Sequence, residues 1–143
     1  MRYRSALVGL LLVGLTLGVS TAVPAQTSPV RRVIDVSLSE FKFQPSEIRF
    51  NEGDTVVIRM RNDGPRFAHN IASRYWTTVP LTVRGDGRQG VDEERKWVVV
   101  DPGKSAEVEF VAQGRGSAAF ICSLFLHAPA GMTGAFYVLP GPR

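Results

Sequence analysis

Four residues of this sequence have the types and spacing to hold a metal ion together. Cys122, His127 and Met132 follow one another near the carboxy end in the pattern C-x4-H-x4-M, and His69 is the only other histidine. A thiolate, an imidazole and a thioether on one short segment are donors that suit copper, which cycles between two oxidation states. Two histidines and one cysteine in a plane, with a distant axial methionine, are the ligands of blue-copper sites. These residue types predict one copper ion, as Cu(I) or Cu(II), per chain.

Taken one at a time, the same residues have ordinary structural roles. A single cysteine such as Cys122 is often buried in a core, a methionine such as Met132 fills gaps between other side chains, and His69 and His127 could be loop histidines. The joint pattern favours metal ligands. It takes in both histidines, the sole cysteine and the only methionine besides Met1 and Met60.

The amino terminus predicts export. Arg2 and Arg4 precede an apolar run over residues 6–19, and small residues ending at Ala25 follow it. This layout is typical of a secretory signal peptide, so we expect residues 1–25 to be removed and the protein to reach the periplasm. The alternative is an uncleaved segment that anchors the chain in a membrane, since a spanning helix needs roughly 20 apolar residues.

The exported chain is expected to be one small domain. Residues 26–32 are interpreted as a flexible mature terminus and residues 33–143 as the folded domain, a size that suits one hydrophobic core. Without the two arginines of the signal peptide, 15 basic residues face 13 acidic ones, a net charge of +2. A nearly neutral chain gives no reason to expect nucleic acid as a partner.

Export makes the single cysteine informative. Exported chains usually use cysteines in disulfide pairs, but Cys122 has no second cysteine in the chain to pair with. A lone thiol in an oxidising compartment is oxidised unless it is buried, paired with another chain or held as a metal thiolate. The copper hypothesis accounts for this residue.

The rest of the sequence predicts short β-strands. Apolar and polar residues alternate over residues 54–61, where Val56, Ile58 and Met60 share one face and Met60 is expected in the core. The same alternation recurs at residues 106–110. Weaker strand signals lie at residues 33–38, 48–50, 97–100 and 135–139. Turn sequences separate these segments, a pattern that predicts an antiparallel sandwich. Residues 71–95 are left without assigned elements, as an excursion between the sheets.

With these residues in view, the chain resembles the cupredoxins, the family of plastocyanin, azurin, auracyanin and rusticyanin. The resemblance covers residues 33–139 and includes the segments 41–45, 51–56 and 101–103 besides the four ligand positions. The spacing from His127 to Met132 is closer to auracyanin and rusticyanin. The resemblance implies an all-β, Greek-key antiparallel β-sandwich.

The resemblance also implies how the site is built. Copper would be bound by His69, Cys122, His127 and Met132. Asn70 and Ser123 match family positions whose hydrogen bonds tie the two ligand loops together. Ala68 stands where azurin has a glycine whose carbonyl approaches the metal, so a fifth ligand is not expected.

The implied function is to carry single electrons between redox partners, as a monomer. In the family, the histidine of the Cys-to-Met loop reaches the surface at its ring edge, which would make His127 the electron port. Around it, Phe125, Leu126, Ala128 and Pro129 would form an apolar patch for transient docking. The alternative is that Phe125 and Leu126 point inward as core residues.

Other classes of function fit the sequence less well. A copper enzyme with a second copper centre would need more than the 2 histidines present, so we expect no enzymatic activity. A Cys–His hydrolase would leave Met132 without a role, and zinc sites seldom use a thioether. The alternative function is a copper-binding module for copper delivery, sensing or oxidase assembly.

Overall fold

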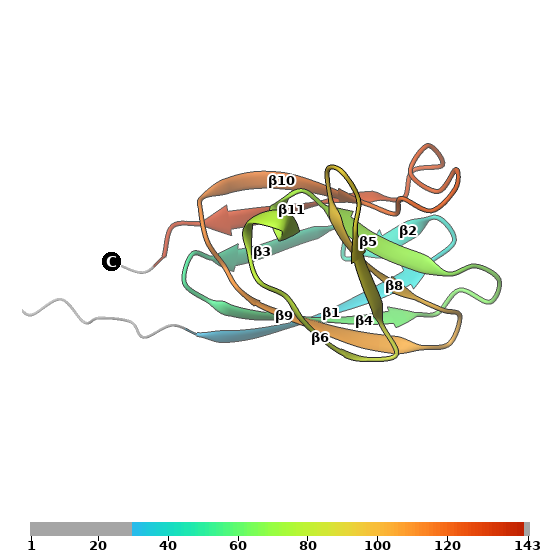
Figure 1. Ribbon diagram of the computed structural model, residues 1–143, viewed down its shortest axis with the longest axis horizontal. Coiled ribbons are helices and arrows are strands. Elements are labelled where there is room, and N and C mark those ends of the chain that lie inside the picture. Colours follow the sequence, from blue (N-terminus) through green and yellow to red (C-terminus); the bar gives the residue numbers. More distant parts are fainter. Residues whose placement is uncertain (1–29, 142–143) are drawn as a thin grey trace, which may run out of the picture.

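The computed structural model describes residues 30–141, which form two β-sheets packed face to face (Figure 1). The five-stranded sheet has the order β2-β1-β4-β9-β6, and the six-stranded sheet has the order β3-β11-β10-β5-β8-β7. The predicted signal peptide, residues 1–25, lies outside the described residues. Within residues 30–141, no helix is long and apolar enough to cross a membrane.

The elements follow one another along the chain with short connections. In chain order they are β1 (Arg31–Ser39), β2 (Lys42–Gln44), β3 (Glu47–Asn51), β4 (Thr55–Asn62), β5 (His69–Ser73), the 3₁₀ turn η1 (Tyr75–Thr78), β6 (Thr82–Gly85), β7 (Arg88–Val91), β8 (Lys96–Val100), β9 (Ser105–Val111), β10 (Gly116–Ile121) and β11 (Thr133–Leu139). Strand β1 includes Arg31 and Arg32, so the folded domain begins before residue 33, its predicted start.

Both sheets are mixed rather than purely antiparallel, which differs from the expectation. Strands β1 and β4 pair in parallel, and so do β3 and β11, whereas the other pairs are antiparallel. The cause is the path of the chain. After β2 it crosses to the other sheet as β3 and returns as β4, so β4 runs in the same direction as β1. The β-sandwich itself is confirmed.

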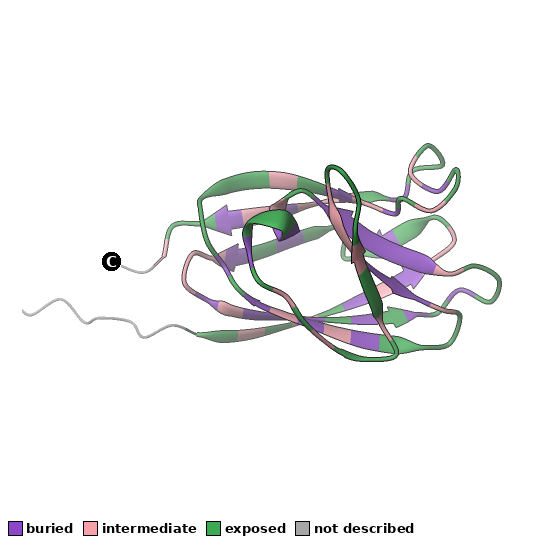
Figure 2. Ribbon diagram, in the orientation of Figure 1, coloured by how far each residue is buried: buried purple, intermediate pink, exposed green. Residues whose placement is uncertain are grey.

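The core lies between the sheets, where the alternating residues of both inner faces meet (Figure 2). Val56, Ile58 and Met60 of β4 are each at most 1% exposed, as their alternation predicts. Aromatic rings fill the middle of this core, with Phe120 and Phe136 only 4.6 Å apart between ring centroids. A fully buried side chain of this size stabilises the fold by about 1.5–3 kcal/mol, so the sandwich is a rigid support for the loops at its ends.

Residues 71–95 cross from one sheet to the other and back, and they contain more regular secondary structure than their sequence indicates. They include most of β5, the turn η1, and strands β6 and β7. Strand β6 pairs with β9 in the first sheet, and β7 pairs with β8 in the second. All five residues of β5 are buried, so it lacks alternation, while β6 and β7 are mostly exposed edge strands. Neither pattern gives a period-two signal.

Candidate metal centre

Two neighbouring strands bring His69 and Cys122 to the same end of the six-stranded sheet. Cys122 directly follows β10, where alternation turns its side chain to the same buried face as Phe120. His69 is the first residue of β5, which pairs antiparallel with β10 through Phe120 opposite Ser73 and Ile121 opposite Ala72. The start of β5 therefore lies beside the residues that follow β10, where Asn70 contacts Ser123.

The loop after β10, residues 122–132, folds back on itself and supplies the other two predicted ligands. The Cys122 N–H donates to the Met132 carbonyl at 3.0 Å, and the Met132 N–H donates to the His127 carbonyl at 3.0 Å. Gly131 has a φ of 102°, a conformation that glycine adopts without strain. These bonds hold Cys122, His127 and Met132 close together. All three side chains are buried.

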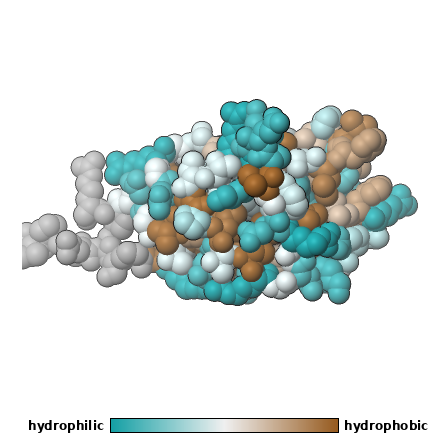
Figure 3. Space-filling view, in the orientation of Figure 1, coloured by the Kyte–Doolittle hydropathy of each residue, from teal (hydrophilic) through white to brown (hydrophobic). Residues whose placement is uncertain are grey.

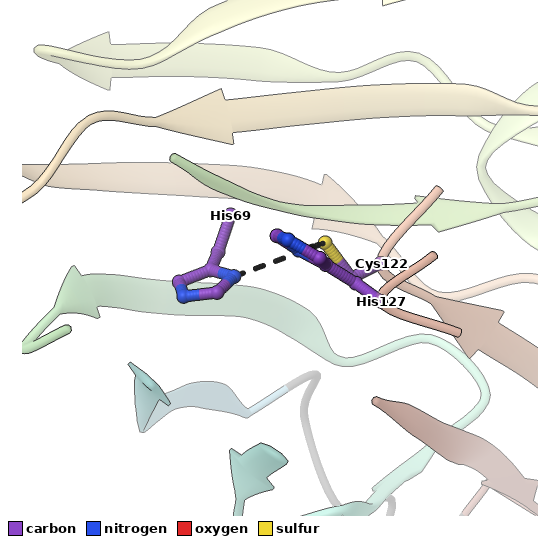
Figure 4. A group of neighbouring side chains, drawn as sticks. All are labelled: His69, Cys122 and His127. Atoms are coloured by element: carbon purple, nitrogen blue, oxygen red, sulfur yellow. Dashed lines mark hydrogen bonds between the residues drawn. The ribbon is translucent and has the colours of Figure 1, made fainter. Parts of the chain in front are cut away.

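Cys122, His69 and His127 converge on one buried point (Figure 4). The Cys122 Sγ lies 3.2 Å from the His127 Nδ1 and 4.0 Å from the His69 Nδ1. Atoms that share one first-row metal ion at about 2.0–2.3 Å each are at most about 4.6 Å apart. The sulfur therefore lies close enough to each imidazole nitrogen to share an ion with it, and one ligand atom from each of the three residues lies within 4.8 Å of the others. The softness of these donors fits copper.

Burial sets the charge of the site when no metal is bound. It raises the pKa of the Cys122 thiol above the ordinary value of 9.0, although the backbone N–H groups of Asn70 and Leu124 act in the opposite direction. The pKa of the His69 imidazole lies below 6.5, because burial and the neighbouring His127 ring disfavour its charged form, while Glu40 favours it. A metal that binds here meets a neutral imidazole and displaces the thiol proton.

Asn70 and Ser123 connect the two segments that carry the ligands. The Asn70 Nδ2 donates to the Ser123 Oγ at 2.9 Å, and the Ser123 N–H donates to the Asn70 Oδ1 at 2.8 Å. The Asn70 N–H also points at the Cys122 sulfur, 3.5 Å away. This arrangement is the one that the resemblance implied, and it fixes the position of the sulfur relative to β5.

A third segment is held by Asn62, which the sequence analysis did not single out. This buried residue ends β4 and lies beneath residues 63–68, the connection to His69. Its Nδ2 donates to the carbonyls of Phe67 and Val100 at 2.9 and 3.0 Å, and its Oδ1 accepts from the Gly64 N–H at 3.0 Å. The Asn-Asp-Gly-Pro turn at residues 62–65 was the available signal.

Most of the ring of His127 is covered. His127 is only 6% exposed. Phe41 and Phe67 meet its imidazole edge to face, with centroids 5.1 and 5.6 Å away. Phe41 belongs to the turn between β1 and β2, and Phe67 to the connection before β5. Three segments far apart in sequence therefore close over the site.

Two residues of the expected docking patch point outward. Phe125 is 88% exposed and Leu126 is 60% exposed, so the alternative that they belong to the core is wrong. Pro129 is also exposed, and Ala128 is partly buried. Phe125 has a φ of 25°, unusual for a residue with a side chain. The tight turn there directs apolar side chains away from the sandwich.

A two-sheet sandwich that gathers two imidazoles and a thiolate at one end is a cupredoxin. Residues 30–139 match the model of the copper binding proteins of the plastocyanin/azurin family. The chain belongs to this family and binds one copper ion.

Comparison with individual proteins agrees with this class. The chain is 25% identical over 148 residues to the copper-resistant cuproprotein CopI of Pseudomonas aeruginosa, covering 82% of this chain and 81% of the relative. A reduced auracyanin of Roseiflexus castenholzii has a similar fold, with a TM-score of 0.60 and 19% identity, over 78% of this chain and 99% of the auracyanin. A multicopper oxidase of Campylobacter jejuni has a TM-score of 0.59 and 12% identity, over 82% of this chain and 32% of the oxidase.

Proposed function

We propose that this protein is a type 1 (blue) copper protein that shuttles single electrons between redox partners outside the cytoplasm. His69, Cys122 and His127 would bind the copper with Met132 as the axial donor. The observation that carries the proposal is the buried Cys122 sulfur, flanked by the Nδ1 atoms of both histidines. That donor set is the one that blue-copper sites use.

The protein's own residues would keep the site unchanged while its charge changes. Copper supplies a one-electron couple when it is bound. The Asn70–Ser123 hydrogen bonds and the backbone bonds within residues 122–132 hold the donors at fixed positions. The rings of Phe41 and Phe67 cover most of the imidazole of His127 and limit its contact with water. Little has to move when an electron arrives or leaves, which favours fast transfer.

Electrons would enter and leave at the end of the sandwich that carries the site. The exposed residues Phe125, Leu126 and Pro129, with Ala128 beside them, supply an apolar surface near His127. Small apolar interfaces of this kind suit short-lived redox contacts. The protein would act as a monomer and not as an enzyme, since 2 histidines leave none for a second copper centre. The predicted signal peptide supports a periplasmic location, with a membrane-anchored form if that segment is retained.

The direct test is the visible absorption spectrum of the mature chain after addition of one equivalent of Cu(II), beside a Cys122→Ser control. We expect an intense blue thiolate-to-copper band that a mild reductant bleaches reversibly and that the serine variant lacks. Weak colour that does not depend on Cys122 would contradict the blue-copper assignment.

A second candidate function is copper handling, meaning delivery, sensing or assistance in oxidase assembly. The similarity to a copper-resistant cuproprotein favours it. The two functions differ in what leaves the protein on contact. Rapid electron self-exchange with the metal retained supports the electron carrier, whereas transfer of the ion itself to an acceptor supports copper delivery.

A further inference from the structure

We propose that the end of the sandwich around His127 is a contact surface for an acidic redox protein. We call this end the copper pole, and define it as residues 40–42, 63–68, 101–104 and 122–132. The proposal deepens the electron-transfer function above and rests on it. It adds the chemistry of the partner, which neither the ligands nor the family assignment specifies.

The centre of the copper pole is aromatic and aliphatic. Phe41 is 38% exposed and Phe67 is 46% exposed, and both rings lie against the buried imidazole of His127. Phe125 and Leu126 add exposed apolar side chains on the loop after β10. The surface at the upper right of the space-filling view, where this loop lies, is brown (Figure 3). A partner that covers these side chains would approach the copper through a single layer of aromatic rings.

Basic residues border this apolar centre. Lys42 follows Phe41, and Arg66 precedes Phe67. Lys104 lies in the turn before β9, and its backbone carbonyl accepts the N–H of Asn62, the last residue of β4. All three are exposed. Among the lysines and arginines of residues 30–141, only these three have a side chain with neither an ion pair nor a hydrogen bond. Their charges are therefore available to a partner.

Carboxylates at the copper pole do not cancel this charge. Two of them are already in ion pairs, Asp63 with Arg61 at 2.7 Å and Asp101 with Arg88 at 2.6 Å. Glu40 is the remaining carboxylate of the defined segments, and it accepts a backbone N–H at 3.2 Å. Arg61 and Arg88, which neutralise these two carboxylates, lie outside the defined segments. With both arginines counted, five basic residues face three carboxylates, a surplus of two positive charges at and beside the copper pole.

This surplus favours an acidic protein over an anionic membrane as the partner. Membrane attachment through charge generally uses clusters of 4–8 basic residues, each worth about 1 kcal/mol near the surface, and the copper pole offers fewer. A redox protein with an acidic margin needs only weak attraction, because complementary charges mainly raise the association rate. The apolar centre then supplies the close contact that electron transfer requires.

The test compares two triple variants with the same total charge. One reverses the copper pole, with Lys42→Glu, Arg66→Glu and Lys104→Glu. The matched control reverses three arginines outside the copper pole, with Arg31→Glu, Arg49→Glu and Arg115→Glu. Each copper(I)-loaded protein is oxidised by anionic hexacyanoferrate(III) or by cationic tris(phenanthroline)cobalt(III) at low and high salt. One electron leaves copper(I) for the oxidant, giving copper(II) and iron(II) or cobalt(II).

A second readout does not depend on electron transfer. Hexacyanochromate(III), an inert paramagnetic anion, is titrated into the copper(I)-loaded protein while the amide NMR signals are recorded. The expected result is broadening of the amide signals of residues 40–42, 64, 66–68 and 103–104, which the copper-pole variant loses and the control keeps. Vesicles containing phosphatidylserine are tested for binding in parallel.

The outcomes are separable. We expect the copper-pole variant to slow oxidation by hexacyanoferrate(III) by about tenfold at low ionic strength and to speed oxidation by the cobalt complex, with both effects reduced by salt. Equal effects of the two variants, or broadening elsewhere, would overturn the proposed surface while leaving the copper function intact. Vesicle binding that only the copper-pole variant loses would assign the surface to a membrane instead. A chain without the thiolate band would overturn the proposed function itself.

Discussion

Asn70 provides a quantitative test of how the two ligand segments are held together. Replacing it by alanine removes the hydrogen bonds of 2.8 and 2.9 Å to Ser123 and leaves the Ser123 N–H without its side-chain acceptor. Each such bond contributes about 0.5–1.5 kcal/mol. Asn70 is only 2% exposed, so truncation also leaves unfilled space. The expected loss of unfolding free energy in the copper-free chain is about 2–3 kcal/mol.

Ser123→Ala is the matched comparison, because it removes only one of the two bonds. Ser123 is exposed, so water can replace part of the lost contact, and the expected loss is about 0.5–1 kcal/mol. Urea unfolding of the copper-free proteins measures both values. The same measurement on the copper-bound proteins also includes any change in copper affinity. Each tenfold loss of copper affinity adds about 1.4 kcal/mol to the loss of unfolding free energy.

The result that would refute this reasoning is specific. If Asn70→Ala and Ser123→Ala destabilise the copper-free chain equally, the Asn70 amide does not join the two segments through both bonds. The loss of unfolding free energy caused by each substitution can also be the same with and without copper. In that case the substitution leaves copper affinity unchanged, and the Asn70–Ser123 link does not position the ligands.

Three further predictions concern the cover, the axial donor and an ion pair away from the site. Phe67→Ala should release copper to a chelator about 2- to 12-fold faster, since an edge-to-face ring contact is worth about 0.5–1.5 kcal/mol, whereas Phe125→Ala, at an 88% exposed position, should not. Met132→Leu should keep the blue band but raise the reduction potential measured by voltammetry, because copper(II) loses a donor; an unchanged potential would exclude the axial role. Burial acts to raise the pKa of Asp54, but hydrogen bonds from a backbone N–H and Arg32 outweigh it and hold the pKa below 3.8. The carboxylate with this depressed pKa stabilises the fold above pH 3.8, and that stabilisation is lost as the pH falls through the folded-state pKa. The difference in unfolding free energy between the native chain and Asp54→Asn, measured in urea, should therefore be largest at pH 7 and shrink as the pH is lowered below 3.8.

Much of the fold could be predicted because several strands face the core on one side only. The alternation in β4 and β9 marks their buried residues directly, as the burial of Val56 and Met60 confirms. Strand β5 could not be recognised, since both of its faces are covered and every residue is buried. The parallel pairs were equally hidden, because pairing between β1 and β4 depends on where the chain crosses between sheets.

In the candidate site, too, features that depend on short sequence segments could be predicted, whereas contacts between distant segments could not. Donor chemistry and spacing indicated all four ligand positions, and the structure gathers His69, Cys122 and His127 into one group. The cover over the site could not be predicted. Phe41 and Phe67 lie 26 residues apart in the sequence and meet His127 only because three separate turns reach the same end of the sandwich.

Both ends of the described chain lie at the opposite end of the sandwich from the metal centre (Figure 1). Val30 accepts a backbone N–H at the start of β4, and Leu139 accepts one from the turn before it. Strand β1 then runs 9 residues toward the site, a length of roughly 30 Å. A molecule fixed to an electrode through either terminus would therefore hold its metal centre at the end that faces away from the electrode. Its metal would be too distant for direct current to the electrode, but open to any protein in the surrounding solution.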